Sequence, residues 1–241
     1  MMIMKKIYLI MMLFFFSSFT PLKEDDLKHE FEKEYREANA WLKQHQQLIQ
    51  SKAGMHGIPP RMLMAIVFPE LIRYNAVYDF METTALSILY VQSGARYADF
   101  SIGHFQMKPS FAEMVEQDAE KLLDPATLKM LNLQWGVVDD EVQRRARINR
   151  LESIDGQMDY LVAFYRIMEQ RTRSMKFNSD EEKLRYYATC YNCGYRKGAE
   201  EINRAMKQKS FYTGKFMTSP TYNYAELSLE WFSRQKINLE R

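Results

Sequence analysis

The strongest constraint on the fold of this chain is the spacing of its apolar residues, which repeats every three or four positions. Between Lys23 and Ala53 the residues that follow this spacing are Leu27, Phe31, Tyr35, Ala38 and Leu42. The spacing places them on one face of an α-helix, with Lys and Glu residues on the opposite face. We therefore predict one long helix from Lys23 to Ala53, which Gly54 can end.

Composition also favours helices over a β-sandwich or barrel. Only 9 glycines and 7 prolines occur in 241 residues, too few for the many tight turns of such folds. Because 46% of the residues are hydrophobic and 14% aromatic, the chain can bury a core, which excludes wholesale disorder. We predict a mainly α protein with irregular chain, including a small hairpin, between residues 75 and 110. The further helices that we expect open after Gly57-Ile58-Pro59-Pro60, lie around Ala85–Val91, open at Asp124-Pro125, cover Asp140–Glu152 and Gln157–Arg171, run from Ser179 to Gly194, and cover Thr221–Arg234.

The first 20 residues have the pattern of a secretory signal peptide. Two lysines precede a ten-residue apolar run, Ile7–Phe16. Ten helical residues rise about 15 Å, which is half of a ~30 Å hydrocarbon core, so a membrane span is not expected. We predict export to the periplasm or cell envelope, with the site of cleavage left open. The remaining chain divides into an N-terminal amphipathic helix, 21–54, and one domain, 55–241.

Charge and histidine spacing exclude two classes of function. The two lysines of the leader account for the net charge of +2, so the rest of the chain is neutral. A neutral protein has no global field to attract nucleic acid, and none is expected as a partner. The four histidines are scattered without the spacing of metal ligands, so we expect no metal site and no cofactor.

Glu70 is the first candidate for chemistry. It falls on the same helical stripe as Leu63 and Val67, where a carboxylate is expensive to bury. Burial would raise its pKa, as an acid that protonates a leaving group near neutral pH requires. Arg73, three residues later, gives a structural alternative, because an ion pair would lower the pKa instead.

Two further stretches carry polar groups suited to a ligand. In the irregular segment Ser101–Ser110, Gly103 lets the backbone approach a ligand, and the amide of Gln106 suits a sugar hydroxyl. At the end of a later helix, the hydroxyl of Tyr191 could hold a buried carboxyl or bind substrate. The alternatives are an ordinary loop and a core aromatic residue.

Cys190 and Cys193 are the only cysteines and form a C-x-x-C pattern. In an exported protein the pair could be a disulfide or a redox centre. The alternative, which we favour, is that both are small apolar residues on a buried helix.

Taken in order, these stretches resemble the soluble lytic transglycosylase family, lysozyme-like enzymes that cleave peptidoglycan. The family pattern is a helix ending in Glu-Ser, then Gly-Leu-Met-Gln, then Ala-Tyr-Asn-Ala-Gly. The corresponding residues here are the helix that leads to Glu70, then Gly103-His104-Phe105-Gln106, then Cys190-Tyr191-Asn192-Cys193-Gly194. The resemblance covers Gly57–Gly194 and implies a lysozyme-like transglycosylase domain. The cysteines take the alanine positions, which is why packing is the favoured reading for them.

The resemblance also implies a reaction and a set of roles. A single glutamic acid, here Glu70, would protonate the glycosidic oxygen of the MurNAc-GlcNAc bond. It would then take a proton from the substrate's C6 hydroxyl, leaving a 1,6-anhydro end. The residues expected to contact substrate are Gln106, Tyr191, Phe105 and Gly103. Supporting roles are expected for Asn192, through backbone contacts, and for Ser101 and Asp99. The partners expected are peptidoglycan strands and an envelope protein bound through the N-terminal helix.

Two departures from the family pattern keep other functions open. Leu71 stands where the family has serine, and 33 positions separate Glu70 from Gly103, which indicates an insertion within Arg73–Ser101. One alternative is a non-catalytic peptidoglycan-binding or scaffold protein on the same fold, and another is a helical adaptor. A third is a lysozyme-type hydrolase with Asp99 as a second carboxylate, although a loop aspartate more often makes a local turn.

Overall fold

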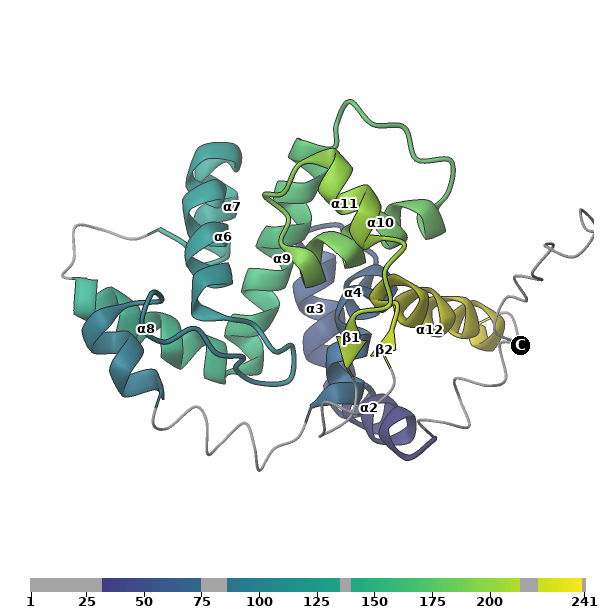
Figure 1. Cartoon of the computed structure of the whole chain (residues 1–241), viewed down its shortest axis with the longest axis horizontal. Helices are drawn as coiled ribbons and strands as arrows, with labels where there is room; N and C mark the ends of the chain where they lie inside the picture. The colour runs from purple at the N-terminus through teal and green to yellow at the C-terminus, as the bar shows by residue number, and fades with distance from the viewer. Residues whose placement is uncertain (1–31, 75–85, 135–139, 213–220, 240–241) are drawn as a thin grey trace, which may run out of the picture. The chain divides into compact units, whose positions relative to one another are not determined.

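The chain is mainly helical in the part that the computed structural model describes, residues 32–74, 86–134, 140–212 and 221–239 (Figure 1). Its helices are α2 (Glu32–Gln44), α3 (Gln46–Met55), α4 (Pro60–Arg73), α6 (Pro109–Leu122), α7 (Pro125–Met130), α8 (Asp140–Glu152), α9 (Ile154–Arg171), α10 (Asp180–Cys193), α11 (Ala199–Ala205) and α12 (Tyr224–Leu239). Residues 86–93 are also helical. Two short strands, β1 (Phe211–Tyr212) and β2 (Thr221–Tyr222), pair antiparallel. The predicted mainly α class is confirmed.

The N-terminal helical segment is not one unbroken helix. At His45 the backbone has φ −100° and ψ 10°, outside helical values, and divides α2 from α3. The ring of His45 lies with Nδ1 2.8 Å from the carbonyl oxygen of Trp41, which also accepts from the backbone N–H of His45, at 3.1 Å. The predicted leader lies outside the described residues. Among the described helices, none is both long and apolar enough to cross a membrane.

Helices α2 and α3 belong to the same compact unit as the rest of the described chain, Lys33–Arg241. The indole Nε1 of Trp231 in α12 donates to Oδ1 of Asn39, at 3.0 Å. The ammonium of Lys52 lies 2.7 Å from the buried carboxylate of Asp159 in α9. A domain boundary after residue 54, as predicted from the sequence, therefore does not separate two units.

Helix α4 is the central helix of the core. Every residue from Met62 to Ile72 is buried, and neighbouring helices α3, α9, α10 and α12 all contact it. Such all-round burial is expected of a helix with apolar residues on every side. Pro60 lies in its first turn as predicted, and the helix continues through Pro69 to Arg73. The continuation carries Glu70 into the core.

Helix α9 connects the two groups of helices that build the unit (Figure 1). It packs on α6 and α8 on one side and on α3 and α4 on the other. Its bounds contain the predicted helix Gln157–Arg171, and α8 has the predicted bounds Asp140–Glu152. The helix expected around residues 85–91 is found over 86–93.

The helix caps that the sequence predicts are present. Asp124 begins α7 by accepting from the backbone N–H of Thr127, and Ser179 begins α10 by accepting from that of Glu182. Gly194 ends α10 with a positive φ of 97°, a conformation that favours glycine.

The C-terminal helix begins later than predicted. Thr221 and Tyr222 lie in β2, and α12 starts at Tyr224. Asn223 accepts a hydrogen bond from the backbone N–H of Glu226, at 3.1 Å, which caps the first turn at this point. The hairpin of β1 and β2 and the short helix α11 are absent from the sequence prediction, since neither carries a helical or alternating period long enough to detect.

Candidate functional site

Glu70 is a buried carboxyl with an incomplete set of partners. Its exposure is 4%, and Nη2 of Arg73 lies 2.6 Å from its Oε2 as an ion pair. The two atoms are close enough for a strong charge–charge interaction, although the angles at Oε2 are not those of a hydrogen bond. On the inner side, the hydroxyl of Tyr224 in α12 also interacts with the Glu70 carboxyl. That hydroxyl lies 3.0 Å from the carbonyl oxygen of Ile66, to which it donates.

The environment raises the pKa of Glu70. Burial is the largest cause and raises this pKa to about 7, while the charge of Arg73 and the hydroxyl of Tyr224 act in the opposite direction. Burial, which raises the pKa of Glu70, and the ion pair with Arg73, which lowers it, are therefore both present, and the effect of burial is the larger. A carboxyl with such a pKa can donate and accept a proton near neutral pH.

The predicted small hairpin is a four-residue turn closed by one bridge. Ile102 and Met107 exchange backbone hydrogen bonds of 3.0 and 3.2 Å across Gly103-His104-Phe105-Gln106. The carbonyl of Gly103 accepts from both the backbone N–H and the side-chain amide of Gln106. This contact fixes the orientation of the Gln106 amide, and the amide's predicted contact with substrate stays a prediction.

Two features of position 103 require glycine: its backbone conformation and the lack of space for a side chain. Its φ is +66°, and a Cβ at this position would lie 1.8 Å from Nε2 of Gln157. The same amide of Gln157 donates to the carbonyl of Leu151, at 2.6 Å, and its oxygen accepts from the N–H of Phe105, at 2.9 Å. Gln157 therefore ties the turn to α9.

Tyr191 connects this turn to Glu70. Its hydroxyl donates to the carbonyl of Phe105, at 2.7 Å, and its pKa is raised far above the ordinary value by burial and then by the charge of Glu70. The three motif regions that the sequence singled out are thus adjacent in the structure. The side chain of Phe105 has no exposed surface, so the expected substrate contact is not visible in this conformation.

A stack of aromatic rings lies over the same turn and escaped the sequence analysis. The ring of His104 stacks between Trp41, with centroids 4.6 Å apart, and Tyr74, at 4.0 Å. His45 adds a fourth ring against Trp41, at 4.2 Å. Burial, with a smaller effect of His45, lowers the pKa of His104 to about 4. The N-terminal helices therefore hold the turn in place.

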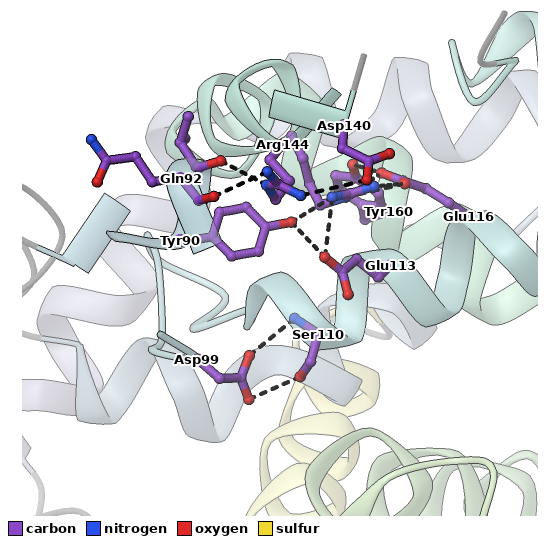
Figure 2. Close-up of polar contacts among 11 residues, drawn as sticks. Tyr90, Gln92, Asp99, Ser110, Glu113, Glu116, Asp140, Arg144 and Tyr160 are labelled. Carbon is purple, nitrogen blue, oxygen red and sulfur yellow. Dashed lines mark hydrogen bonds and ion pairs between the residues drawn. The ribbon is translucent and has the colours of Figure 1, made fainter. Parts of the chain in front are cut away.

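The three residues expected in supporting roles differ in their surroundings. Asp99 accepts from the backbone N–H and the hydroxyl of Ser110, at 3.0 and 2.9 Å, and so caps the start of α6 (Figure 2). Ser101 is half-buried next to the bridge residue Ile102. Asn192 is exposed on the last turn of α10, because that turn directs Tyr191 inward. Exposure does not agree with the buttressing role expected for Asn192.

A second buried polar cluster surrounds Arg147 of α8. The carboxylate of Glu116 accepts from Nε and Nη2 of Arg147, at 2.9 and 2.5 Å, and from the hydroxyl of Tyr160, at 2.5 Å. Nη1 of Arg147 donates to the hydroxyl of Tyr90, which donates in turn to Glu113, at 2.7 Å (Figure 2). No motif pointed to this cluster, since its members come from four separate helices.

A cavity of about 820 Å³ lies beside the Arg147 cluster, between α6 and α8. Its polar lining includes Glu113, Glu116, Arg144 and Arg147. Neither Glu70 nor the Gly103–Gln106 turn lines it. Nε of Arg144 donates to the carbonyl of Val91 at the end of the helix over residues 86–93, at 2.7 Å. The cavity is therefore a second hollow, distinct from the candidate acid.

The two cysteines are free thiols, with Cys190 buried and Cys193 half-buried. Burial raises the pKa of the Cys190 thiol, so it has little of the thiolate character that redox chemistry needs. This agrees with the packing role that we favoured. In the described part of the chain, His, Cys, Asp and Glu side chains form no group of three or more that could hold a metal ion.

No protein-family model, curated protein or solved structure matches this chain.

Proposed function

We propose that this protein is a peptidoglycan lytic transglycosylase with a lysozyme-like domain, exported to the cell envelope. The observation that carries the proposal is the environment of Glu70, a buried carboxyl whose pKa is raised to about 7. It is supported by the adjacency of Tyr191 and the Gly103–Gln106 turn, which hydrogen-bond through Phe105. The three motif regions of the resemblance lie next to one another, which supports the proposal.

The chemistry follows from one carboxyl that titrates near neutral pH. Protonated Glu70 gives its proton to the glycosidic oxygen, and the bond to the anomeric carbon breaks. The resulting carboxylate removes the proton of the substrate's C6 hydroxyl, whose oxygen bonds to the anomeric carbon and closes the 1,6-anhydro ring. The second step restores the acid, so neither water nor a second carboxylate is consumed.

Tyr224 can replace part of what the family serine contributes. Leu71 has no hydroxyl, but the Tyr224 hydroxyl interacts with the Glu70 carboxyl from α12. It has a single hydrogen, which it gives to the carbonyl of Ile66. When Glu70 is protonated, the hydroxyl oxygen can accept from it; when Glu70 is ionised, the same hydroxyl can turn and donate to it. Tyr224 is thus suited to both stages of the reaction.

Mass spectrometry of the products released from purified peptidoglycan tests the proposal. The protein is expected to release glycans with 1,6-anhydro-MurNAc ends, and Glu70→Gln is expected to release none while remaining folded. Glu200→Gln, which changes an exposed carboxylate on α11, is the matched control and should retain full activity. Unchanged product formation by Glu70→Gln would reject the assignment, and reducing ends would indicate hydrolysis.

A non-catalytic peptidoglycan-binding protein is the second candidate. The cavity of about 820 Å³ beside Arg147 favours it, because its polar walls lie away from Glu70 and give room for a ligand there. On this alternative, the protein and Glu70→Gln co-sediment equally with cell-wall sacculi and release nothing. The envelope partner expected at the N-terminal helix stays a prediction under either function.

A further inference from the structure

Arg73 lies on the solvent side of Glu70 and covers it. The side chain of Arg73 is 33% exposed, whereas that of Glu70 is 5% exposed, although the two lie one helical turn apart on α4. With Nη2 2.6 Å from Oε2, the guanidinium occupies the position from which a substrate oxygen would have to approach that atom. In this conformation the acid of the proposed reaction is closed to a glycan.

The guanidinium of Arg73 is held in place by the β-hairpin. Its central carbon lies 4.9 Å from the ring centroid of Phe211 in β1, a cation–π contact. Phe211 is buried and meets Tyr224 edge-on, with centroids 4.9 Å apart and planes at 87°. Tyr224 in turn interacts with Glu70, so these four side chains form a closed ring of contacts near the end of α4.

The ion pair within this ring is incomplete on both sides. Oε2 of Glu70 and Nε of Arg73 are buried, and neither makes a hydrogen bond. Buried ion pairs that serve stability normally satisfy such atoms, and exceptions call for an explanation such as function or stored strain. Because the Arg73 side chain already reaches solvent, water can solvate its guanidinium when it leaves Glu70.

We propose that Arg73 and Phe211 act as an opening cover over Glu70, so that glycan cleavage requires the guanidinium to move off the carboxyl. This inference rests on the proposed function for its purpose, but the cover itself is a property of the four side chains. It makes Arg73 a positioning residue that acts through Glu70.

Opening the cover has a second consequence for the acid. The positive charge of Arg73 favours the ionised form of Glu70, and its departure removes that effect. Entry of solvent acts in the opposite direction, because it weakens the burial that raises the pKa of Glu70. Arg73 therefore controls both access to Glu70 and one of the charges that set its protonation.

Chemical labelling of Glu70 tests the cover without reference to activity. A carbodiimide with a small amine labels accessible protonated carboxyls, and peptide mapping by mass spectrometry reports the rate at Glu70. At about pH 5, Glu70 is protonated with or without Arg73, so the rate measures access alone. Arg73→Met is expected to raise this rate by about fivefold or more, since labelling follows the population of the open form.

Arg61 provides a matched control on the same helix. Its guanidinium lies 3.8 Å from the ring centroid of Phe232, but it is at the opposite end of α4 from Glu70. Arg61→Met should leave the labelling rate unchanged. Phe211→Leu, which removes the ring and keeps the charge, should raise the rate less than Arg73→Met. Circular dichroism checks that each variant is folded.

The outcomes separate the cover from the proposed function. With glycan as substrate, Arg73→Met is expected to increase kcat/KM and to move the upper limb of the pH profile up by about one unit. Faster labelling with no cleavage by any variant would support the cover and reject the enzyme. An unchanged labelling rate in folded Arg73→Met and Phe211→Leu would overturn the cover, even if the parent protein cleaves glycan.

Discussion

Glu70 and Glu116 are equally buried glutamates whose partners differ, with exposures of 4% and 5%. Glu116 receives two nitrogens of Arg147 and the hydroxyl of Tyr160, all with hydrogen-bond geometry. Glu70 has one close guanidinium without that geometry and keeps an unsatisfied oxygen. Similar burial therefore conceals a difference between the two carboxyls, which lies in how completely their oxygens are hydrogen-bonded.

The largest expected effect on stability comes from breaking the hydrogen-bonded ion pair of Arg147 and Glu116. Arg147→Met leaves the Glu116 carboxylate buried with only Tyr160 as donor, and is expected to lower the free energy of unfolding by about 3–5 kcal/mol. Urea unfolding monitored by circular dichroism measures this change.

Two arginines provide the comparison for Arg147→Met. Arg145 in the same helix makes an exposed pair with Glu141, so Arg145→Met should change stability by less than about 1 kcal/mol. Arg73→Met should also lower the free energy of unfolding less than Arg147→Met does, because the Glu70 carboxyl, with a pKa raised to about 7, can take up a proton when its partner is removed. Equal losses for Arg73→Met and Arg147→Met would contradict the distinction between the two glutamates.

The second effect is a change in the free energy of unfolding with pH that comes from Glu70. Its pKa rises from an ordinary 4.5 to about 7 on folding, which corresponds to about 3 kcal/mol. Because the folded-state pKa is the higher one, this contribution is fully present below about pH 4.5 and is lost as the pH rises through about 7.

Glu70→Gln removes that pH dependence. The variant and the parent are expected to unfold at similar urea concentrations near pH 4, and the variant should be more stable by about 3 kcal/mol near pH 8. Taking the difference between the two proteins cancels every other titrating group. A difference that stays constant with pH would show that Glu70 is not held protonated by burial.

Local patterns predicted most of the helices and the burial of Glu70, since both depend on neighbours within a few positions. The period of the apolar residues located α8 and α9, and capping residues located the starts of α7 and α10. The spacing of the apolar residues around Glu70 also predicted that its carboxyl lies in the core. Arg73, its ion-pair partner, is only three positions later in the sequence.

The remaining parts of the site depend on contacts between distant segments. In the sequence, Tyr224 has the pattern of an ordinary core residue of the last helix. Its neighbours along the chain do not indicate that its hydroxyl interacts with Glu70. The same holds for Trp41, whose ring stacks on His104 across the fold. The supporting role expected for Asn192 stays a prediction, and the helix phase turns this residue toward solvent.

The smallest effect concerns Asp99, the third carboxylate of interest. Both of its oxygens accept from Ser110, so its role in the structure is to cap α6. Asp99→Ala is expected to lower the free energy of unfolding by about 1 kcal/mol and to leave the type of glycan product unchanged. Asp124→Ala, which removes a similar cap at α7, is the matched control. If Asp99→Ala instead abolished cleavage in a folded protein while Asp124→Ala did not, Asp99 would be the second carboxylate of a hydrolase, and Glu70 would not act alone.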